Sequence, residues 1–425
     1  MTRAVVFCLA AGMASAQTIS LTVNTDTVLH AIDEKIYGQS LEHIYHSASG
    51  GPGNPGGAAE ERNLFLRTGG FRPDLTQAVA ALHPPIIRWT GGPPAGEYKW
   101  KDDIGPQSKR AGHRRGDEVD PPSFGIDEFL AFTQKVGAEP VVVIRVGPGS
   151  KTERATLLRD AADLLDYCNG PRESVWGKIR TRNGHPEPYR VKYWEIDTET
   201  GKLPPAESVE ALGQFVTAMK QVDPTIRTIG PRGLADYFSV HLDERSKNPK
   251  AKLFVSGWKT QNADWLGGLQ AGAILNAMER DAAVAMAAAS PDNALIGFDR
   301  GSWFPSPNYV VMKLYREHFA PEVLEIAGNL GDLSATATRT ADREKIYLKL
   351  VNAREQDVSV AVVLRGDFPL LGASMRMVAP DRLTARNTLE QPAAVQAVPA
   401  KVERIGMTAR LRLPRWSVAV VTLSR

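Results

Sequence analysis

The chain has 425 residues, of which 43% are hydrophobic and 23% are charged. These ordinary fractions exclude a disordered or coiled-coil protein, and at about 150 residues per domain the length favours two to three domains. Lys and Arg number 51 against 48 Asp and Glu, so the formal charge is only +3. Phosphate binding needs clustered basic residues, and no such cluster occurs, so no nucleic-acid partner is expected.

The first sixteen residues have the composition of a secretory signal. Arg3 supplies the positive start, residues 4–14 are apolar, and residues 14–16 read Ala-Ser-Ala, a small-x-small cleavage site. The apolar run is too short to span a bilayer, and no later stretch is long enough, so no membrane partner is expected. We therefore expect a secreted or periplasmic protein that begins near Gln17 after cleavage.

Short β-rich runs alternate with helix-like stretches through the middle of the chain. The expected strands are 86–89, 141–146, 191–196, 226–229, 237–241 and 253–256. The expected helices are 127–136, 151–167, 206–222 and 266–289, the last including the Ala-rich residues 282–289. This alternation favours parallel strands with crossover helices, and eight such units form a (β/α)8 TIM barrel. A doubly wound sheet is the alternative, but no Gly-rich phosphate turn follows a first strand.

After about residue 320 the pattern becomes that of an all-β module. Residues 345–351 and 358–364 alternate, and residues 410–423 are β-rich, which predicts an antiparallel β-sandwich. Residues 19–23 also alternate, and we expect them to join that sandwich. The predicted organisation is a signal peptide (1–16), a sandwich strand (17–36), the barrel (37–320) and a C-terminal β-sandwich (321–425).

Ordered motifs run through most of the chain beyond the signal. They are 36–43 (IYGQSLEH), 70–74 (GFRPD), 84–92 (PPIIRWTGG), 100–106 (WKDDIGP), 183–189 (NGHPEPY), 191–194 (VKYW), 306–309 (SPNY) and 415–420 (RWSVAV). These motifs resemble those of the α-L-arabinofuranosidases of glycoside hydrolase family 51. The resemblance implies a barrel with a β-sandwich, no cofactor, and a plant-type polysaccharide or oligosaccharide that contains arabinose. Whether the chain forms a homo-oligomer stays open.

The same resemblance implies a retaining reaction, which needs an acid/base and a nucleophile carboxylate about 5 Å apart. The family's acid/base Glu stands in a Gly-Asn-Glu motif, which reads Asp197-Thr198-Glu199 here. Glu199 thus keeps the carboxylate that would protonate the leaving oxygen and then deprotonate water. Thr198 replaces an amide that faces the sugar, and a hydroxyl provides only part of the amide's hydrogen bonding. The alternative for Glu199 is a surface carboxylate at a strand end.

The nucleophile position carries no carboxylate. The resemblance places the nucleophilic Glu in Leu253-Phe254-Val255-Ser256-Gly257-Trp258, at the position of Gly257. Glycine has no side chain and cannot attack an anomeric carbon. The family's Gly-Gly-Asn also reads Gly91-Gly92-Pro93. These departures leave two hypotheses: a glycosidase with a changed mechanism, or a carbohydrate-binding pseudoenzyme without catalysis. A scaffold role is neither supported nor excluded.

Further residues would border the sugar. The resemblance places Glu42 and His241 in or near the sugar pocket, and the others fall at or beside predicted strand ends. The candidates for substrate binding are Glu42, Arg88, Trp89, Thr198, His241 and Trp258. Their alternatives are structural: a helix-start carboxylate for Glu42, a satisfied buried histidine for His241, and core packing for the tryptophans. Four other carboxylates could replace the nucleophile, namely Asp197, Asp243, Glu244 and Asp264. A wider separation between such a carboxylate and Glu199 would make the reaction inverting.

Metal and thiol chemistry have little support in the sequence. His43 and His46 lie three residues apart, but no HExxH motif or Cys cluster accompanies them, so no metal site is expected. Beyond the signal, Cys168 is the one thiol, and its apolar surroundings contain no activating base.

Overall fold

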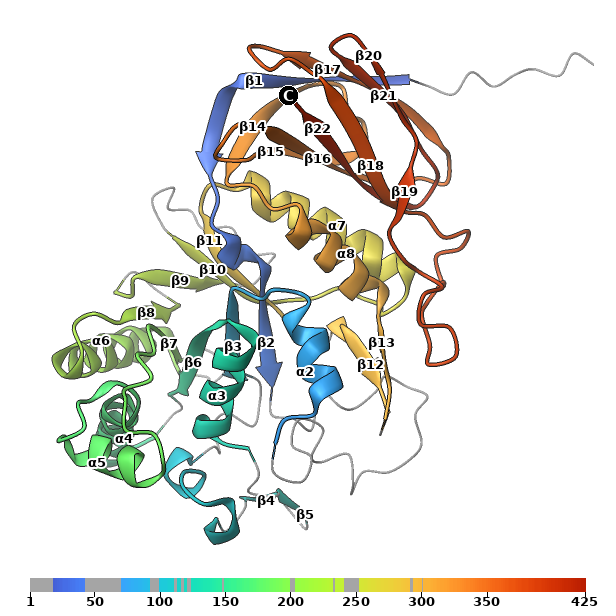
Figure 1. The fold of residues 1–425 in the computed structure, drawn as a ribbon. Helices are drawn as coiled ribbons and strands as arrows, with labels where there is room; N and C mark the ends of the chain where they lie inside the picture. The colour runs from blue at the N-terminus through green and yellow to red at the C-terminus, as the bar shows by residue number, and fades with distance from the viewer. Residues whose placement is uncertain are drawn as a thin grey trace, which may run out of the picture.

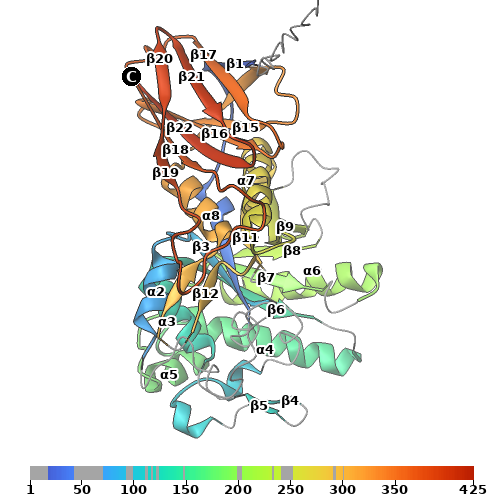
Figure 2. The same cartoon turned by 90° about the vertical axis from the view of Figure 1, so that its right-hand side faces the viewer.

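The computed structural model describes residues 18–42, 70–91, 99–110, 113–115, 118–120, 124–146, 149–198, 203–231, 234–240, 252–290, 293–299 and 301–425. The predicted signal peptide lies outside these described residues. They form a barrel and a β-domain, with two helices packed between them (Figures 1 and 2). None of their helices is both long enough and apolar enough to cross a membrane.

Eight parallel strands of the described residues close into the predicted barrel (Figure 1). In barrel order they are β10 (Leu253–Trp258), β11 (Val284–Ala289), β2 (Gly38–Glu42), β3 (Ile86–Gly91), β6 (Glu139–Arg145), β7 (Tyr193–Asp197), β8 (Arg227–Gly230) and β9 (Tyr237–Val240). Neighbouring strands all pair in parallel, so their carboxyl ends share one edge. The interior is filled by apolar side chains that include Ile86, Val141, Tyr193 and Phe254.

Helices and short connecting elements surround the barrel. The helices are α2 (Pro73–Ala80), α3 (Ile126–Val136), α4 (Lys151–Asn169), α5 (Val175–Arg182), α6 (Pro205–Val222), α7 (Trp265–Arg280) and α8 (Pro307–Glu317). The shorter elements are the 3-10 turns η1 (Glu34–Tyr37), η4 (Trp100–Asp102) and η5 (Gln107–Lys109) and the strand pairs β4 (His113–Arg115) with β5 (Glu118–Asp120) and β12 (Ile296–Phe298) with β13 (Trp303–Pro305). The sequence patterns predicted α3, α4 and α6 but not α2, α5 or α8.

The expected helix over 266–289 is wrong in its last third. Helix α7 ends at Arg280, and Val284–Ala289 forms strand β11 between β10 and β2. Alanine has the highest helix propensity, but tertiary pairing on both sides overrides it. The turn between the two elements is fixed by Asp281, whose carboxylate accepts the Ala283 amide at 2.9 Å.

Strand β2, which the sequence patterns did not predict, lies close to its neighbours. A Cβ on Gly38 would come within 2.3 Å of Ile86 Cγ1 on β3 and 2.5 Å of the Ala287 carbonyl oxygen on β11. Since real Cβ atoms do not approach other atoms so closely, a glycine is needed at this position for the barrel to close.

The link from β8 to β9 spans only residues 231–236, and its described residues contain no helix. Such a short link suffices because Ile229 already lies level with Tyr237, the first residue of β9. The Asp236 carboxylate fixes the link by accepting the Thr228 amide at 2.8 Å and the Lys220 ammonium at 2.9 Å. Partial burial would raise the pKa of Asp236, but these hydrogen bonds hold it below its usual range.

The β-domain is one ten-stranded sheet among the described residues. Its order is β19 (Val398–Ala400), β18 (Gly372–Val378), β22 (Ser417–Ser424), β16 (Lys345–Asn352), β15 (Ser334–Arg339), β14 (Glu322–Gly328), β1 (Thr18–Ala31), β17 (Val358–Arg365), β21 (Thr408–Leu413) and β20 (Val402–Ile405). Near the two ends of this order, β18 and β20 contact each other, so the sheet wraps around one apolar core.

Two details of this sheet differ from the expectation. Its pairing is not wholly antiparallel, because β1 runs antiparallel to β14 but parallel to β17. The predicted run over 410–423 is two strands, β21 and β22, separated at Pro414–Trp416, where Trp416 has a φ of 54°. Proline cannot donate to a ladder and the left-handed region turns the chain, so the run breaks there.

Helices α7 and α8 lie between the barrel and the β-domain (Figure 2). Within this contact the Lys349 ammonium of β16 pairs with the Glu279 carboxylate of α7, and both side chains are fully buried. The Tyr37 hydroxyl of η1 donates to Glu279 and lies 3.2 Å from Lys349 Nζ. Desolvation lowers the pKa of Lys349, although Glu279 opposes the shift. One buried cluster thus ties the barrel to the β-domain.

Candidate active site

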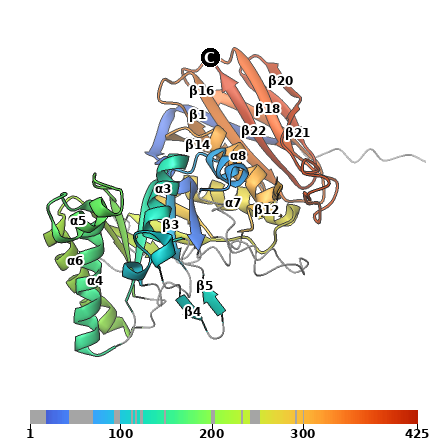
Figure 3. The ribbon, with the colours of Figure 1, turned by 60° about the horizontal axis from the view of Figure 1, so that its bottom comes forward.

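The barrel strands end at one edge, which carries the residues predicted from the sequence on β3, β7 and β10. Figure 3 brings the lower side of Figure 1 forward, where the arrow of β2 points and the β4–β5 pair lies. Among the described strands in chain order, β7 is the fourth of the barrel and β10 the seventh, and β8 and β9 separate them. The strand before Glu199 and the strand of Gly257 therefore face the mouth from different sides.

A polar network crosses the barrel interior below this edge. Arg88 Nε lies 2.5 Å from Glu195 Oε2, and Arg88 Nη2 lies 3.0 Å from Glu195 Oε1, a bidentate pair. The Ser239 hydroxyl donates to Glu195 at 3.4 Å and lies 2.9 Å from the Ser256 hydroxyl. The network therefore runs from β3 through β7 and β9 to β10, and it ends one residue before Gly257. Arg88, predicted to bind substrate, is held by Glu195 in this structure.

Asp197 and Thr198 follow on the same strand. The Asp197 carboxylate is largely buried, and its Oδ2 lies 3.8 Å from Nε of Arg145 at the end of β6. Thr198 is fully buried, and its hydroxyl bonds the Ser208 hydroxyl of α6 at 2.5 Å. The Thr198 side chain is thus engaged with α6. Glu199 comes next in the chain but lies outside the described residues.

Gly257 occupies a bulge at the end of β10. Ser256 pairs with Ala288 and Trp258 with Ala289, so Gly257 is the extra residue between them. Its φ is +84°, in the left-handed region that favours glycine. Among the described residues other than its two chain neighbours, no atom lies within 4 Å of the position where its Cβ would be, so the described part of the chain leaves this space open. The backbone here suits glycine, while the surrounding volume would admit a side chain.

The four tryptophans near strand ends pack into the apolar core. Trp89 stacks on Phe129 of α3, with ring centroids 5.0 Å apart, on the opposite face of β3 from Arg88. Trp194 donates its indole N–H to the Val191 carbonyl at 3.0 Å, and Trp100 packs against Tyr167 and Trp176. Trp258 is only 1% exposed. These rings fit the core-packing alternative better than stacking on a sugar.

The remaining predicted residues are either committed elsewhere or outside the described part of the chain. The Asp264 carboxylate caps α7 by accepting the Leu266 amide at 3.1 Å. Glu42 ends β2, and only its backbone is described. The predicted residues His241, Asp243 and Glu244 lie outside the described residues, as do His43 and His46.

Cys168 is fully buried at the end of α4. Burial raises the pKa of its thiol well above the usual range, and the nearby Asp127 carboxylate adds to the shift. Asp127 itself accepts hydroxyl hydrogen bonds from Tyr167 at 2.8 Å and Tyr189 at 3.1 Å. A protonated, enclosed thiol of this kind is not a nucleophile. Within the described residues, no group of three or more His, Cys, Asp or Glu side chains is placed to hold a metal ion.

Three polar residues of the barrel interior were not predicted as site residues: Arg145, Ser239 and Ser256. Each lies two residues beyond an interior side chain of its own strand, for example Val143 before Arg145 and Phe254 before Ser256. Because alternate residues of a strand face the same side, this spacing is the signal that could have found them once the interior face was known.

Comparison with known proteins covers both units. The family model for the α-L-arabinofuranosidase 1 domain matches residues 78–271, and the model for the α-L-arabinofuranosidase C-terminal domain matches residues 238–417. A probable α-L-arabinofuranosidase C of Aspergillus clavatus is 30% identical over 238 residues, 53% of this chain and 44% of that protein. An intracellular exo-α-(1→5)-L-arabinofuranosidase of Acetivibrio thermocellus is 31% identical over 219 residues, 49% of this chain and 41% of that protein.

The match therefore spans less than half the length of these curated relatives. The crystal structure of the GH51 arabinofuranosidase from Xanthomonas axonopodis pv. citri has the same fold, with a TM-score of 0.81 at 21% identity over 96% of this chain and 100% of that one. The two family models together span the barrel beyond its first strand and most of the β-domain. Because both family models match, and together cover residues 78–417, the chain belongs to the α-L-arabinofuranosidase family.

Proposed function

We propose that this protein is a secreted or periplasmic glycosidase that removes terminal arabinofuranosyl groups from plant-type glycans without a protein nucleophile. The observation that carries the proposal is the open space at Gly257, on the strand where the family resemblance places the nucleophilic Glu. The described residues leave room there for water or a small anion, where a carboxylate would otherwise lie. Family membership and the predicted acid/base position of Glu199 support the same activity.

The chemistry that follows is a single displacement. Glu199 donates its proton to the leaving oxygen as the bond between that oxygen and the anomeric carbon breaks. Water forms the new bond to the anomeric carbon from the opposite side and loses a proton to a carboxylate of the pocket. Asp197, Asp243 and Glu244 are the candidates for that base. One displacement inverts the anomeric configuration, whereas two displacements through a nucleophile would retain it.

The second candidate function is carbohydrate binding without catalysis. The observation that favours it is that three described carboxylates on or just after the barrel strands already have partners. Glu195 is held by Arg88, Asp197 faces Arg145, and Asp264 caps α7. A base that must accept a proton from water would first have to leave such a partner. In this case the protein would bind arabinose-containing glycans and release them unchanged.

Hydrolysis of aryl α-L-arabinofuranosides and aryl xylosides separates the two functions. For the glycosidase we expect turnover by the wild type, a loss of about 10²-fold or more in Glu199→Gln, and an inverted product in proton NMR. No turnover with any glycoside would refute the glycosidase. Calorimetry with arabinan and arabinoxylan fragments then tests the binding protein, and absence of heat at millimolar ligand would refute that function too.

Azide and formate probe the space at Gly257 directly. If the rest of the site is intact, an external anion there attacks the anomeric carbon and raises turnover of an activated aryl arabinofuranoside. The control is Gly257→Ala, which adds one methyl group to that space and should reduce the rescue. A wild type that responds to neither anion at any concentration would contradict an accessible vacancy at this strand end.

The variant Gly257→Glu tests the same position by supplying the missing carboxylate. The φ of +84° is unfavourable for glutamate by about 1–2 kcal/mol, so the bulge must relax before the new carboxylate reaches the mouth. We expect a folded protein with slightly reduced stability, and any new activity should give the retained product.

A further inference from the structure

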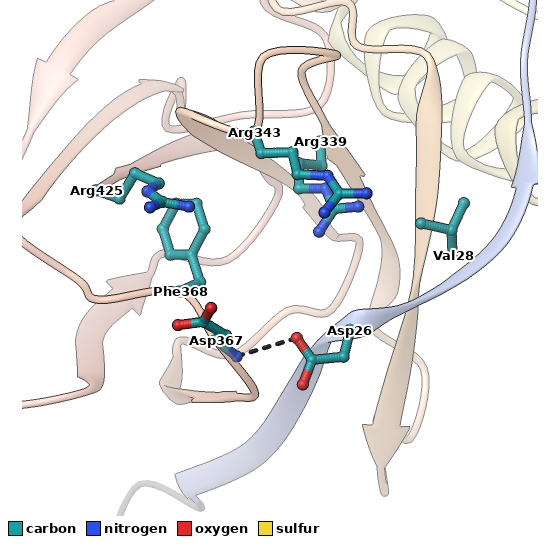
Figure 4. A pocket seen from close by; sticks show the side chains of 7 residues that line it. All are labelled: Asp26, Val28, Arg339, Arg343, Asp367, Phe368 and Arg425. Carbon is teal, nitrogen blue, oxygen red and sulfur yellow. Dashed lines mark hydrogen bonds between the residues drawn. The ribbon is translucent and has the colours of Figure 1, made fainter.

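The β-domain contains a charged cavity of about 450 Å³ that has no part in the barrel site. Figure 4 shows its lining, which comes from β1, the end of β15, the β15–β16 turn, the β17–β18 connection and Arg425. None of these elements belongs to the barrel. The volume lies within the range of small-molecule sites, which is about 300–1,000 Å³.

Three arginines supply one part of this lining. Arg339 is fixed: its guanidinium donates to Glu322 at 2.8 Å and to the Thr25 carbonyl at 2.6 Å. Arg343 and Arg425 are exposed, and Arg425 Nε reaches Glu344 only at 4.0 Å. The Arg339 guanidinium, whose charge is paired with Glu322, thus lies in the cavity wall, while the Arg343 and Arg425 guanidiniums face solvent. This arrangement suits a planar anion such as a carboxylate.

Two aspartates supply the other polar groups of the cavity. The Asp26 carboxylate accepts the Asp367 amide at 3.0 Å, which ties β1 to the β17–β18 connection (Figure 4). The Asp367 side chain lines the same cavity. Carboxylates accept hydrogen bonds from hydroxyl groups, and Val28, which is 40% exposed, adds an apolar surface at the rim. A ligand for this cavity therefore combines a negative group, hydroxyls and a hydrocarbon face.

The backbone at Arg343 is a second, independent observation. Arg343 has a φ of 61° in the turn that joins β15 to β16. Glycine or asparagine usually fills this left-handed position, because a Cβ there meets the following carbonyl oxygen. An arginine held in an unfavourable backbone conformation, with its guanidinium in a cavity, is the pattern expected of a functional residue.

We propose that this cavity binds a sugar acid, the uronate unit of an acidic glycan. The guanidiniums of Arg343 and Arg425 take the sugar carboxylate, and Asp26 and Asp367 accept its hydroxyls. The choice of a glycan as the ligand rests on the proposed function, while the match to a carboxylated sugar rests on the lining. The β-domain would then hold acidic chains while the barrel mouth handles neutral arabinofuranosyl groups.

Calorimetry at low salt with digalacturonate, the neutral galactobiose and inorganic phosphate tests the proposal. We expect digalacturonate to bind with a millimolar Kd or tighter, and each of the other two to bind at least about tenfold more weakly. Equal binding of galactobiose would overturn the role of the carboxylate. Equal binding of phosphate would reduce the cavity to a general anion site and overturn the sugar assignment. No heat with digalacturonate at about 10 mM would overturn the proposal outright.

The variant Arg343→Gly removes the guanidinium and suits the backbone better, so it should melt at or above the wild-type temperature. We expect its Kd for digalacturonate to rise at least about tenfold, and Arg386→Gly, at an exposed arginine that does not line the cavity, to change it less than about twofold. An unchanged Kd in Arg343→Gly would refute the site. Digalacturonate binding should persist in Glu199→Gln, and arabinofuranoside turnover should persist in Arg343→Gly. The two variants therefore distinguish failure of the proposed uronate site from failure of the proposed glycosidase activity.

Discussion

The ion pair between Arg88 and Glu195 provides a measure of how far water enters the barrel. Their side chains are 10% and 3% exposed. Removing one partner leaves a buried charge without its counter-charge, which destabilises proteins by about 3–5 kcal/mol. We expect Arg88→Met and Glu195→Gln each to fall in that range. The double variant should cost at least about 1 kcal/mol less than the sum, because neither charge is then left alone.

Urea unfolding followed by tryptophan fluorescence measures these free energies, and Trp89 and Trp194 lie next to the two residues in the sequence. The matched control is Arg172→Met, which breaks an exposed pair with Glu187 at 2.6 Å. This control should cost less than about 1 kcal/mol. If Arg88→Met and Glu195→Gln cost no more than the control, water reaches the pair and the reasoning is refuted.

Three further predictions concern the frame around the site. Gly38→Ala should destabilise the protein by about 3 kcal/mol or more, because the added Cβ would overlap two neighbouring strands. Gly257→Ala should cost only about 1–2 kcal/mol, because the single penalty is its positive φ. Comparable urea midpoints for the two variants would contradict this expectation. Glu279→Gln should cost about 3–5 kcal/mol of stability, because it leaves the buried Lys349 ammonium without a counter-charge. The double variant Glu279→Leu with Lys349→Met should recover most of that stability, and a double variant that melts no higher than Glu279→Gln would contradict this. Burial lowers the pKa of His318, so the unfolded chain binds more protons below about pH 6.5 and stability should fall as the pH drops through that value. Urea midpoints between about pH 5 and 7 should show this slope in the wild type and a smaller one in His318→Phe; equal slopes would refute it.

Most barrel strands were predictable because buried parallel strands appear as short apolar runs between turns. Strands β2 and β11 are the two exceptions, and β11 shows where this rule fails. Four of the six residues 284–289 are alanine. Such a run has a high helix propensity, but its position between two barrel strands makes it a strand. Only the neighbours β10 and β2 decide between them. The parallel pairing of β1 with β17 was equally hidden, since alternation shows a strand but not its partners.

For the described candidate residues, the sequence predicted which strands carry them but not which atoms they contact. Family motifs located the ends of β3, β7 and β10, and the structure brings those ends to one edge. Successive side chains of a strand point to opposite faces, and only the closed barrel decides which face is the interior. Arg88 therefore points into the barrel and Trp89 toward α3. The cap formed by Asp264 likewise depends on where α7 begins, and the expected helix started one residue after the observed one.

The position of β1 has a consequence for the order of folding. In the sheet it separates a group of six strands that ends at β14 from the group of β17, β21 and β20. Every other strand of that sheet follows the barrel in the chain, so on the ribosome β1 emerges first and has no partner until the barrel has been synthesised. A fragment of residues 321–425 alone would lack the strand that joins its two groups. The two units are therefore expected to reach their final stability together, and truncation at either end should weaken both.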